Sequence, residues 1–476
     1  MSIAPIRVFD GSKSAEIRAW TRYFNIARAA AVVGILGAPF SLWALFWTSP
    51  RDYPFLSSML FVPLVILGCA MLFSRLWRGD RFVKLLFGAG IAVRLAAAGL
   101  FVWVGFFVYG AAVDAFHYWA VGLQLVDQFS FLGWAAFQPP YWSSSLIFDI
   151  CGIIMLVTGN ALPTLSVIFA LAALLGGYFF YRAFCLAFPQ GNRGLYGLLV
   201  VLLPSILFWS SAIGKDALEQ LFIGISAYGF ARATKRLDPW AILVCSIGVA
   251  GSAAVRPHIG AMLAVSILVP LGLGKTRTRS GWIATAGKML LLPLLAAGTL
   301  FMVSQAELFV GMQSSDFENG IKTLDTKQKD AFLGSSTFNQ GESLPRRIGE
   351  GPFMLFRPFP WEVHSATAGI ASLEGIGLLY LCWRRRRELW ALLRRWREAY
   401  VGFLLLYSLE FSIIFAAASG NFGTLVRQRI MLVPIVLMLF CAERSATAAA
   451  VRRPVLQGNP GRWARVPAPL SNRAGS

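Results

Sequence analysis

Long apolar runs recur along the whole of this 476-residue chain, and they constrain its fold more than any other feature. A helical run of about 18 apolar residues or more is long enough to cross the roughly 30 Å hydrocarbon layer of a bilayer. With 57% hydrophobic and 14% charged residues, the chain has too much apolar surface to bury in one water-soluble core. The sequence therefore predicts an all-α, polytopic integral membrane protein.

We expect about twelve transmembrane helices in one polytopic domain, residues 25–445, flanked by a cytoplasmic N-terminal segment, 1–24, and a basic cytoplasmic tail, 446–476. The predicted spans are 25–48, 54–74, 85–110, 161–181, 194–212, 216–231, 239–255, 258–273, 286–309, 365–383, 399–419 and 424–442.

Two predicted outer connections exceed the length of a turn. The first, 111–160, includes an apolar run at 145–158 that is too short to span comfortably, so we expect amphipathic or re-entrant helices along the outer surface. The second, 310–364, is rich in polar residues and is expected to be a mobile loop, a usual place for a lid over a site.

The distribution of Lys and Arg predicts the orientation of the chain. If the segments between the predicted spans lie alternately on the two sides of the membrane, 29 of the 43 basic residues fall on the side of the N-terminus and 11 on the other. Because short basic loops stay cytoplasmic, this pattern predicts a multi-pass protein with both termini on the cytoplasmic side. The arginine-rich stretch 384–397 and the tail 447–476 are then expected to anchor at the inner leaflet instead of binding nucleic acid, for which no motif is present.

The same alternation of segments between the two sides of the membrane places five polar stretches together on the outer face. They are VDAFHYW (113–119), FWSSAIGKDA (208–217), VRPH (255–258), FRPFPWEVH (356–364) and GNFGTLVRQR (420–429). All three histidines, His117, His258 and His364, lie within them. A polytopic protein that gathers its acids, histidines and basic residues at one face is expected to carry out chemistry there.

Three residues in these stretches, Asp114, His117 and Asp216, are candidates for catalytic work. Asp114 has His117 and Tyr118 three and four residues on, hence on the same side of a helix, and can accept a proton from a sugar hydroxyl as a general base. Asp216 follows Lys215, which can reach an anionic head group while Asp216 orients a partner or a cation. Both aspartates also fit the alternative of a helix N-cap.

The predicted substrate-binding set consists of basic and aromatic residues and one acid: Tyr118, Lys215, Arg256, His258, Arg357, Trp361, Glu362, Arg427 and Arg429. Several guanidinium groups beside few acids match the oxygens of a lipid phosphate. Arg427 and Arg429 point about 200° apart on a helix, so at most one of them is expected to face the site. The alternative is that these arginines snorkel to outer-leaflet head groups.

With these residues in view, the chain resembles the GT-C superfamily of polyprenyl-phosphate-sugar-dependent glycosyltransferases, especially the bacterial relatives of protein mannosyltransferases. The resemblance lies in D-x-x-x-Y at the first large outer loop (Asp114, Tyr118), in P-S-x-x-x-W-S-S…K-D-A-L…A-Y-G-F-A-R over 204–232, and in G-x-x-x-R-x-R-x-x-x-x-P over 423–434. It spans most of residues 85–442.

The resemblance implies an inverting transfer from a lipid-phosphate sugar donor to a glycan, lipid or protein acceptor, with Asp114 as the base, Asp216 as a second acid and basic residues on the phosphate. This chain departs from the family pattern in two ways. The acid follows the third predicted helix instead of the first, and Ala115 stands where many relatives carry a second acid. The second departure weakens the case for a metal, and the need for a divalent cation stays open.

Two other classes of function stay open. A Wzy-like polymerase or an O-antigen-ligase-type enzyme also uses outer-face arginines and a histidine, with lipid-pyrophosphate substrates and about twelve helices, but typically without a loop carboxylate. A transporter or flippase would need several charged residues at mid-membrane depth, where the main candidates are Arg94, Glu374 and Glu410.

Overall fold

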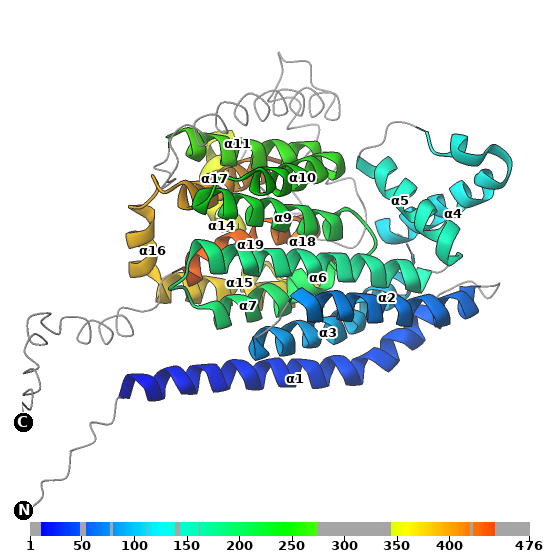
Figure 1. Ribbon diagram of the computed structural model, residues 1–476, viewed down its shortest axis with the longest axis horizontal. Helices are drawn as coiled ribbons and strands as arrows, with labels where there is room; N and C mark the ends of the chain where they lie inside the picture. The colour runs from blue at the N-terminus through cyan, green and yellow to red at the C-terminus, as the bar shows by residue number, and fades with distance from the viewer. Residues whose placement is uncertain are drawn as a thin grey trace, which may run out of the picture.

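The computed structural model describes residues 11–47, 54–76, 80–111, 113–138, 143–160, 162–273, 344–418 and 422–442, and these contain helices and no strand. The predicted all-α class is therefore confirmed for the described part of the chain. The α-helices are α1 (Gly11–Trp47), α2 (Pro54–Leu76), α3 (Arg81–Phe107), α4 (Asp114–Leu132), α5 (Ser143–Thr158), α6 (Leu162–Ala187), α7 (Arg193–Leu202), α8 (Pro204–Trp209), α9 (Lys215–Lys235), α10 (Pro239–Val255), α11 (Pro257–Leu273), α14 (Leu344–Met354), α15 (Ala366–Arg384), α16 (Arg386–Leu393), α17 (Ala399–Ala418), α18 (Phe422–Gln428) and α19 (Val433–Cys441). Most of them run side by side in one direction across Figure 1.

Four described helices are long and apolar enough to cross a membrane, as is typical of a membrane-embedded protein. They are Ile17–Ala44 of α1, Ser57–Leu76 of α2, α3 and α6, and the pair Phe422–Met431 and Val433–Cys441, bent by 56°, would make a fifth if it forms one broken span. The predicted number of twelve spans is not confirmed, and the predicted span 286–309 lies outside the described residues.

Two predicted spans are interrupted, and proline marks both breaks. The run 194–212 divides into α7 and α8 because Pro204, which has no backbone N–H, begins a new helix after the extended residue Leu203. The run 424–442 divides at Leu432, and Pro434 stands in the first turn of α19. Hydropathy alone did not reveal these breaks because apolar residues continue through them.

Helix α6 lies at the centre of the bundle and packs closely against α9. A Cβ atom on Gly176 would lie 2.2 Å from the carbonyl oxygen of Gln220, and one on Gly224 would lie 2.5 Å from the carbonyl oxygen of Gly176. These two glycines therefore let the backbones of α6 and α9 touch, in the way that small residues bring membrane helices together. This contact fixes the position of α9, which begins with Lys215 and Asp216.

The five polar stretches meet at one end of the bundle, as predicted from alternation. Helix α9 begins at this end and α10 returns to it, so that Asp216 and Arg256 come together. At the opposite end, the backbone N–H of Asn192 binds the carbonyl oxygen of Cys441, 2.9 Å away, and α16 connects α15 to α17. Helix α16 stands upright at the left of Figure 1, across the direction of the bundle, and α4 and α5 lie at the right.

The two long outer connections differ from each other in the structure. The first forms the helices α4 and α5, which pack against each other as a pair, in line with the helices predicted there. The second was predicted to be a mobile loop throughout 310–364, and this is wrong from residue 344 onward because α14 packs against α17. Met354, the last residue of α14, is 4% exposed, so this part belongs to the core. The rest of the predicted lid lies outside the described residues.

If the bundle crosses the membrane with the polar stretches outside, the two ends must differ in their accessibility to a membrane-impermeant thiol reagent. We expect Thr367→Cys, at the start of α15, to be labelled in intact cells, and Ala391→Cys, in α16, to be labelled only after permeabilisation. Both parental residues are exposed. The measurement needs a background without the native cysteines, such as Cys69. Labelling of Ala391→Cys in intact cells would contradict the orientation.

Candidate functional site

Asp216 stands at the centre of a group of charged residues drawn from four helical segments. It is the second residue of α9, and it is 4% exposed. Its Oδ1 accepts a hydrogen bond from Nη2 of Arg256, 2.8 Å away, and its Oδ2 accepts one from Nε of Arg427. Arg256 lies between α10 and α11, and Arg427 lies in α18. Both carboxylate oxygens are thus used to hold two arginines that are 171 residues apart in the chain.

Arg427 also joins Asp114 to this group. Its Nη1 donates to Oδ2 of Asp114 over 2.6 Å, and the Asp114 side chain remains 55% exposed. The same arginine therefore holds one buried and one exposed carboxylate. We call Asp114, Lys215, Asp216, Arg256 and Arg427 the Asp216 cluster.

The structure shows how the two aspartates relate to their helix starts. The N-cap of α4 is Val113 and that of α9 is Gly214, and neither helix start has a side-chain capping bond. Asp114 and Asp216 lie one and two residues inside their helices and direct their carboxylates to arginines instead. The alternative reading of both aspartates as N-caps is therefore not what the structure shows.

Lys215 and Tyr118 line the cluster. Nζ of Lys215 donates to Oγ of Ser143 over 2.9 Å, and burial, followed by repulsion from Arg256, lowers the pKa of this ammonium group to about 8. Burial raises the pKa of the Tyr118 phenol to about 12, so it stays protonated near neutral pH. The Tyr118 ring lies 3.2 Å from the position that a Cβ atom on Gly214 would take, and Gly214 has φ of 148°, which a larger residue rarely adopts.

The charge balance of the Asp216 cluster favours an anion. Three basic side chains, Lys215, Arg256 and Arg427, meet two carboxylates, so the group carries one net positive charge when all five are ionised. A buried ammonium group with a lowered pKa gains from an added negative charge beside it. The arrangement therefore suits a bound phosphate oxygen more than a further cation.

Glu219 was missed by the sequence analysis. It lies one turn after Asp216 on α9, is fully buried, and its Oε2 accepts a hydrogen bond from Oγ of Ser252, 2.7 Å away. Ser252 itself is one turn before Arg256 on α10. The spacing of three residues from Asp216 within an apolar stretch was the available signal, because an acid there must face the same side of the helix.

Arg429 faces the other side of the chain from Arg427, as the two-residue spacing predicted. Its Nη2 pairs with Oε1 of Glu374 over 3.0 Å, and Glu374 also accepts bonds from the backbone N–H and the hydroxyl of Ser205. Nη1 of Arg429 donates to the carbonyl oxygen of Arg357 over 2.7 Å. Arg429, directly after α18, therefore connects its segment to α15 and to the segment after α14, and Glu374 connects both to Ser205 of α8.

The residues of the FRPFPWE stretch form a separate group. Arg357 pairs with Glu362, and Nε of Arg357 lies 3.0 Å from Oε1 of that carboxylate. Oε2 of Glu362 accepts the backbone N–H of Phe359 over 2.8 Å. This hydrogen-bonded turn presents Trp361, which is 77% exposed and stacks on the Phe359 ring with centroids 5.0 Å apart. Arg357 thus pairs with the acid of its own turn, and its guanidinium carbon lies 5.5 Å from the ring centre of Phe422 in α18.

The three histidines lie in different surroundings. His117 is exposed on α4, and its ring meets the Phe148 ring edge-on at 5.3 Å. His258 follows Arg256 by two residues at the start of α11, and its ring lies 6.4 Å from that of Phe415. His364 is exposed just before α15. His117 thus lies on the helix that supplies Asp114, and His258 adjoins the turn that supplies Arg256.

The charged residues that a translocation path would need make hydrogen bonds elsewhere in the fold, while Nε and Nη2 of Arg94 are buried without a hydrogen-bond partner. Arg94 is fully buried in α3, and its Nη1 donates to Oγ of Ser210 over 2.8 Å. Glu410 accepts a bond from Oγ of Ser266 over 2.9 Å. Arg94 therefore supports the turn that precedes Lys215, and Glu410 ties α17 to α11.

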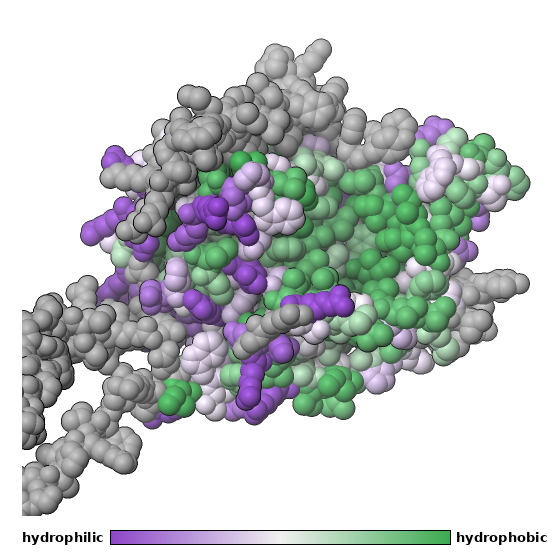
Figure 2. Space-filling view, in the orientation of Figure 1, coloured by the Kyte–Doolittle hydropathy of each residue, from purple (hydrophilic) through white to green (hydrophobic). Residues whose placement is uncertain are grey.

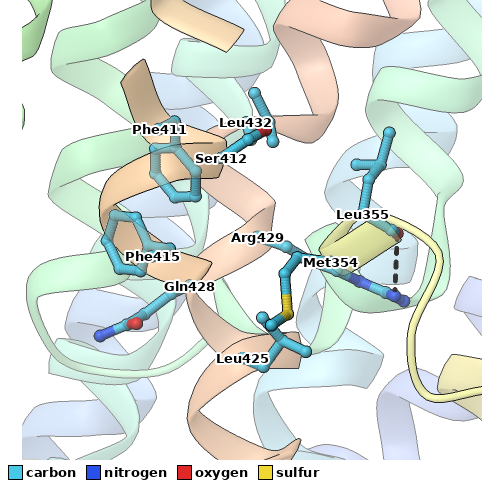
Figure 3. Close-up of a pocket in the computed structure, with 9 residues that line it drawn as sticks. All are labelled: Met354, Leu355, Phe411, Ser412, Phe415, Leu425, Gln428, Arg429 and Leu432. Atoms are coloured by element: carbon cyan, nitrogen blue, oxygen red, sulfur yellow. Dashed lines mark hydrogen bonds between the residues drawn. The ribbon is translucent and has the colours of Figure 1, made fainter. Parts of the chain in front are cut away.

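A small, largely apolar pocket lies on the Arg429 side, as Figure 3 shows. It is lined by Met354, Leu355, Phe411, Ser412, Phe415, Leu425, Gln428, Arg429 and Leu432. Arg429 reaches across it to the carbonyl oxygen of Leu355. Its lining contains no residue of the Asp216 cluster, so the pocket and the charged site are distinct.

The described residues offer no group of three or more His, Cys, Asp or Glu side chains placed to hold a metal ion. In the Asp216 cluster both carboxylates share Arg427, so the donor set does not fit a divalent cation. We therefore derive no step through a metal.

Comparison of the chain with protein-family models, with curated proteins and with solved structures gives no match.

Removing Glu374 should destabilise the fold strongly. Glu374→Ala leaves the buried Arg429 guanidinium without its carboxylate, and loss of one partner of a buried ion pair costs about 3–5 kcal/mol. Glu398→Ala is the matched control, since its pair with Arg395 is exposed and is worth about 0–1 kcal/mol. Thermal unfolding of the purified protein in detergent measures both. Equal midpoints for the two variants would contradict the role of Arg429 as a tie.

Proposed function

We propose that this protein is a membrane glycosyltransferase that transfers a sugar from a polyprenyl-phosphate donor to an acceptor at the outer face of a bacterial inner membrane. The observation that supports it most is the double use of Arg427, which pairs with the exposed Asp114 and the buried Asp216. A guanidinium group that can hold phosphate is thereby placed directly beside a carboxylate that can accept a proton.

The donor phosphate is assigned to Arg256, Arg427 and Lys215. Asp216 uses one donor atom of each arginine, Nη2 of Arg256 and Nε of Arg427, and a guanidinium group has five N–H donors in all. Asp216 therefore acts in this proposal by orienting the two arginines toward the phosphate. Its own oxygens are both engaged, which argues against its being the base.

Asp114 is the proposed general base. Arg427 binds only its Oδ2, and the side chain is half-exposed, so Oδ1 can meet the acceptor hydroxyl. In the reaction the acceptor O–H bond breaks and its proton passes to Asp114, while the acceptor oxygen bonds to the anomeric carbon. The bond between that carbon and the phosphate oxygen breaks, and the arginines stabilise the charge on the departing polyprenyl phosphate.

The acceptor side is assigned to exposed residues on α4 and on the turn after α14. His117 on α4 and Trp361 on that turn are both open to solvent, and an aromatic face such as that of Trp361 can cover a sugar ring. The proposed acceptor is a glycan, a lipid or a protein.

The base assignment predicts a large effect of Asp114→Asn. Asparagine is nearly the same size and can still accept a bond from Arg427, but it cannot take a proton, so transfer should slow by about 10²-fold or more while the protein stays folded. The matched control is Asp127→Asn, an exposed aspartate on the same helix. The measurement is sugar transfer from a purified polyprenyl-phosphate donor by each variant.

Transfer at the parental rate by Asp114→Asn would remove the base assignment. If Arg256 or His258 variants were inactive in the same assay, the result would instead favour a lipid-pyrophosphate-dependent polymerase or ligase. That alternative has its own support in the position of His258 two residues after Arg256.

The phosphate assignment predicts graded effects at Arg256. Arg256→Ala should weaken donor binding by about tenfold or more, since it removes charge-assisted hydrogen bonds. Arg256→Lys should weaken it less, because lysine keeps the charge but loses the planar fork. Arg193→Ala, an exposed arginine at the opposite end of the bundle, is the control. Donor affinities that agree across all these variants would show that Arg256 only pairs with Asp216.

A further inference from the structure

Helix α16 differs from the rest of the bundle in its direction. It connects α15 to α17 at the end opposite the Asp216 cluster, and Figure 1 shows it upright where the neighbouring helices run horizontally. Leu392 is 2% exposed and Leu389 packs against the core, so one side of α16 is docked on the protein. If α15 and α17 cross a membrane, α16 must lie along its surface.

Large apolar side chains on and beside α16 point away from the protein. Trp383, Trp390 and Trp396 are 60%, 62% and 51% exposed, and Leu393 is also exposed. Trp390 and Leu393 are three residues apart and share one side of the helix. Tryptophan with one apolar body and one polar N–H is the residue that gathers at the boundary between hydrocarbon and head groups.

Exposed arginines surround these tryptophans: Arg384, Arg386, Arg387, Arg394 and Arg397. The guanidinium carbon of Arg386 lies 5.0 Å from the Trp383 ring centre, and that of Arg397 lies 5.2 Å from the Trp396 ring centre. Two acids balance only part of this charge, since Glu388 pairs with Arg385 and Glu398 with Arg395. Figure 2 shows hydrophilic residues gathered at this end of the molecule.

We propose that α16 and its flanking residues, 383–397, form a binding surface for anionic phospholipid head groups. Arginine binds the phosphate of such a lipid, while Trp390 and Leu393 on the same surface enter the layer beneath the head groups. An RNA or DNA backbone would satisfy the arginines but would leave the exposed leucine and tryptophan side chains in water. The mixture of exposed apolar and cationic residues on a helix across the bundle therefore fits a lipid surface better than a nucleic acid.

The test compares lipid binding by two double variants of the whole protein. Arg386→Gln with Arg397→Gln changes the proposed surface, and Arg18→Gln with Arg22→Gln changes two exposed arginines of α1 as the matched control. Each purified protein is titrated in neutral detergent with phosphatidylglycerol and, separately, with phosphatidylcholine, and bound lipid is counted by native mass spectrometry.

We expect the parental protein to prefer phosphatidylglycerol, the α16 double variant to bind it about tenfold more weakly or worse, and the α1 variant to change little. Trp390→Ala should also weaken binding while leaving the charge unchanged.

Equal binding of the two lipids by the parent, or an unchanged affinity in the α16 variant, would overturn the proposal. Tighter binding of a single-stranded RNA than of phosphatidylglycerol vesicles would overturn it in favour of nucleic acid. Thermal unfolding of each variant shows whether a loss reflects misfolding.

Discussion

The carboxylate of Asp216, buried between two guanidinium groups, is the interaction on which the arrangement of the site depends. It joins the start of α9 to the turn between α10 and α11 and to α18. Burying these charges in a low-dielectric bundle is costly unless each meets a partner, and here each does. Arg427 extends the same interaction to Asp114 at the start of α4. The exposed acid is thereby held in place by a residue that the buried acid orients.

Arg427 and Arg429 lie two residues apart in one short segment and have different partners. Arg427 faces the Asp216 cluster, while Arg429 binds Glu374 and the carbonyl oxygen of Arg357. The segment that carries Arg427 is therefore held from its opposite side by α15 and by the residues after α14.

The sequence predicted which residues gather at one end of the bundle, but only part of their pairing. From the alternation of apolar runs across a membrane, we predicted that Asp114, Asp216, Arg256 and Arg427 lie at the same end. Their two-residue spacing predicted that the side chains of Arg427 and Arg429 point in different directions. The partners of Arg429 and Arg357 could not be predicted, because Glu374 and Glu362 stand in other segments whose packing depends on the whole fold. The breaks at Leu203 and Leu432 were also missed, since a hydrophobic run looks the same whether or not its helix continues.

The central claim is that the Asp216 cluster binds the phosphate of a lipid-linked sugar beside Asp114. The most direct measurement is an experimental structure of the protein with a polyprenyl-phosphate sugar, or with polyprenyl phosphate itself. The account predicts phosphate oxygens within hydrogen-bonding distance of Arg427 and Arg256, with the anomeric carbon on the side of Asp114. A phosphate bound in the pocket beside Arg429 would contradict it. So would a phosphate bound far from Arg256 and Arg427, at a site that leaves their pairs with Asp216 unchanged.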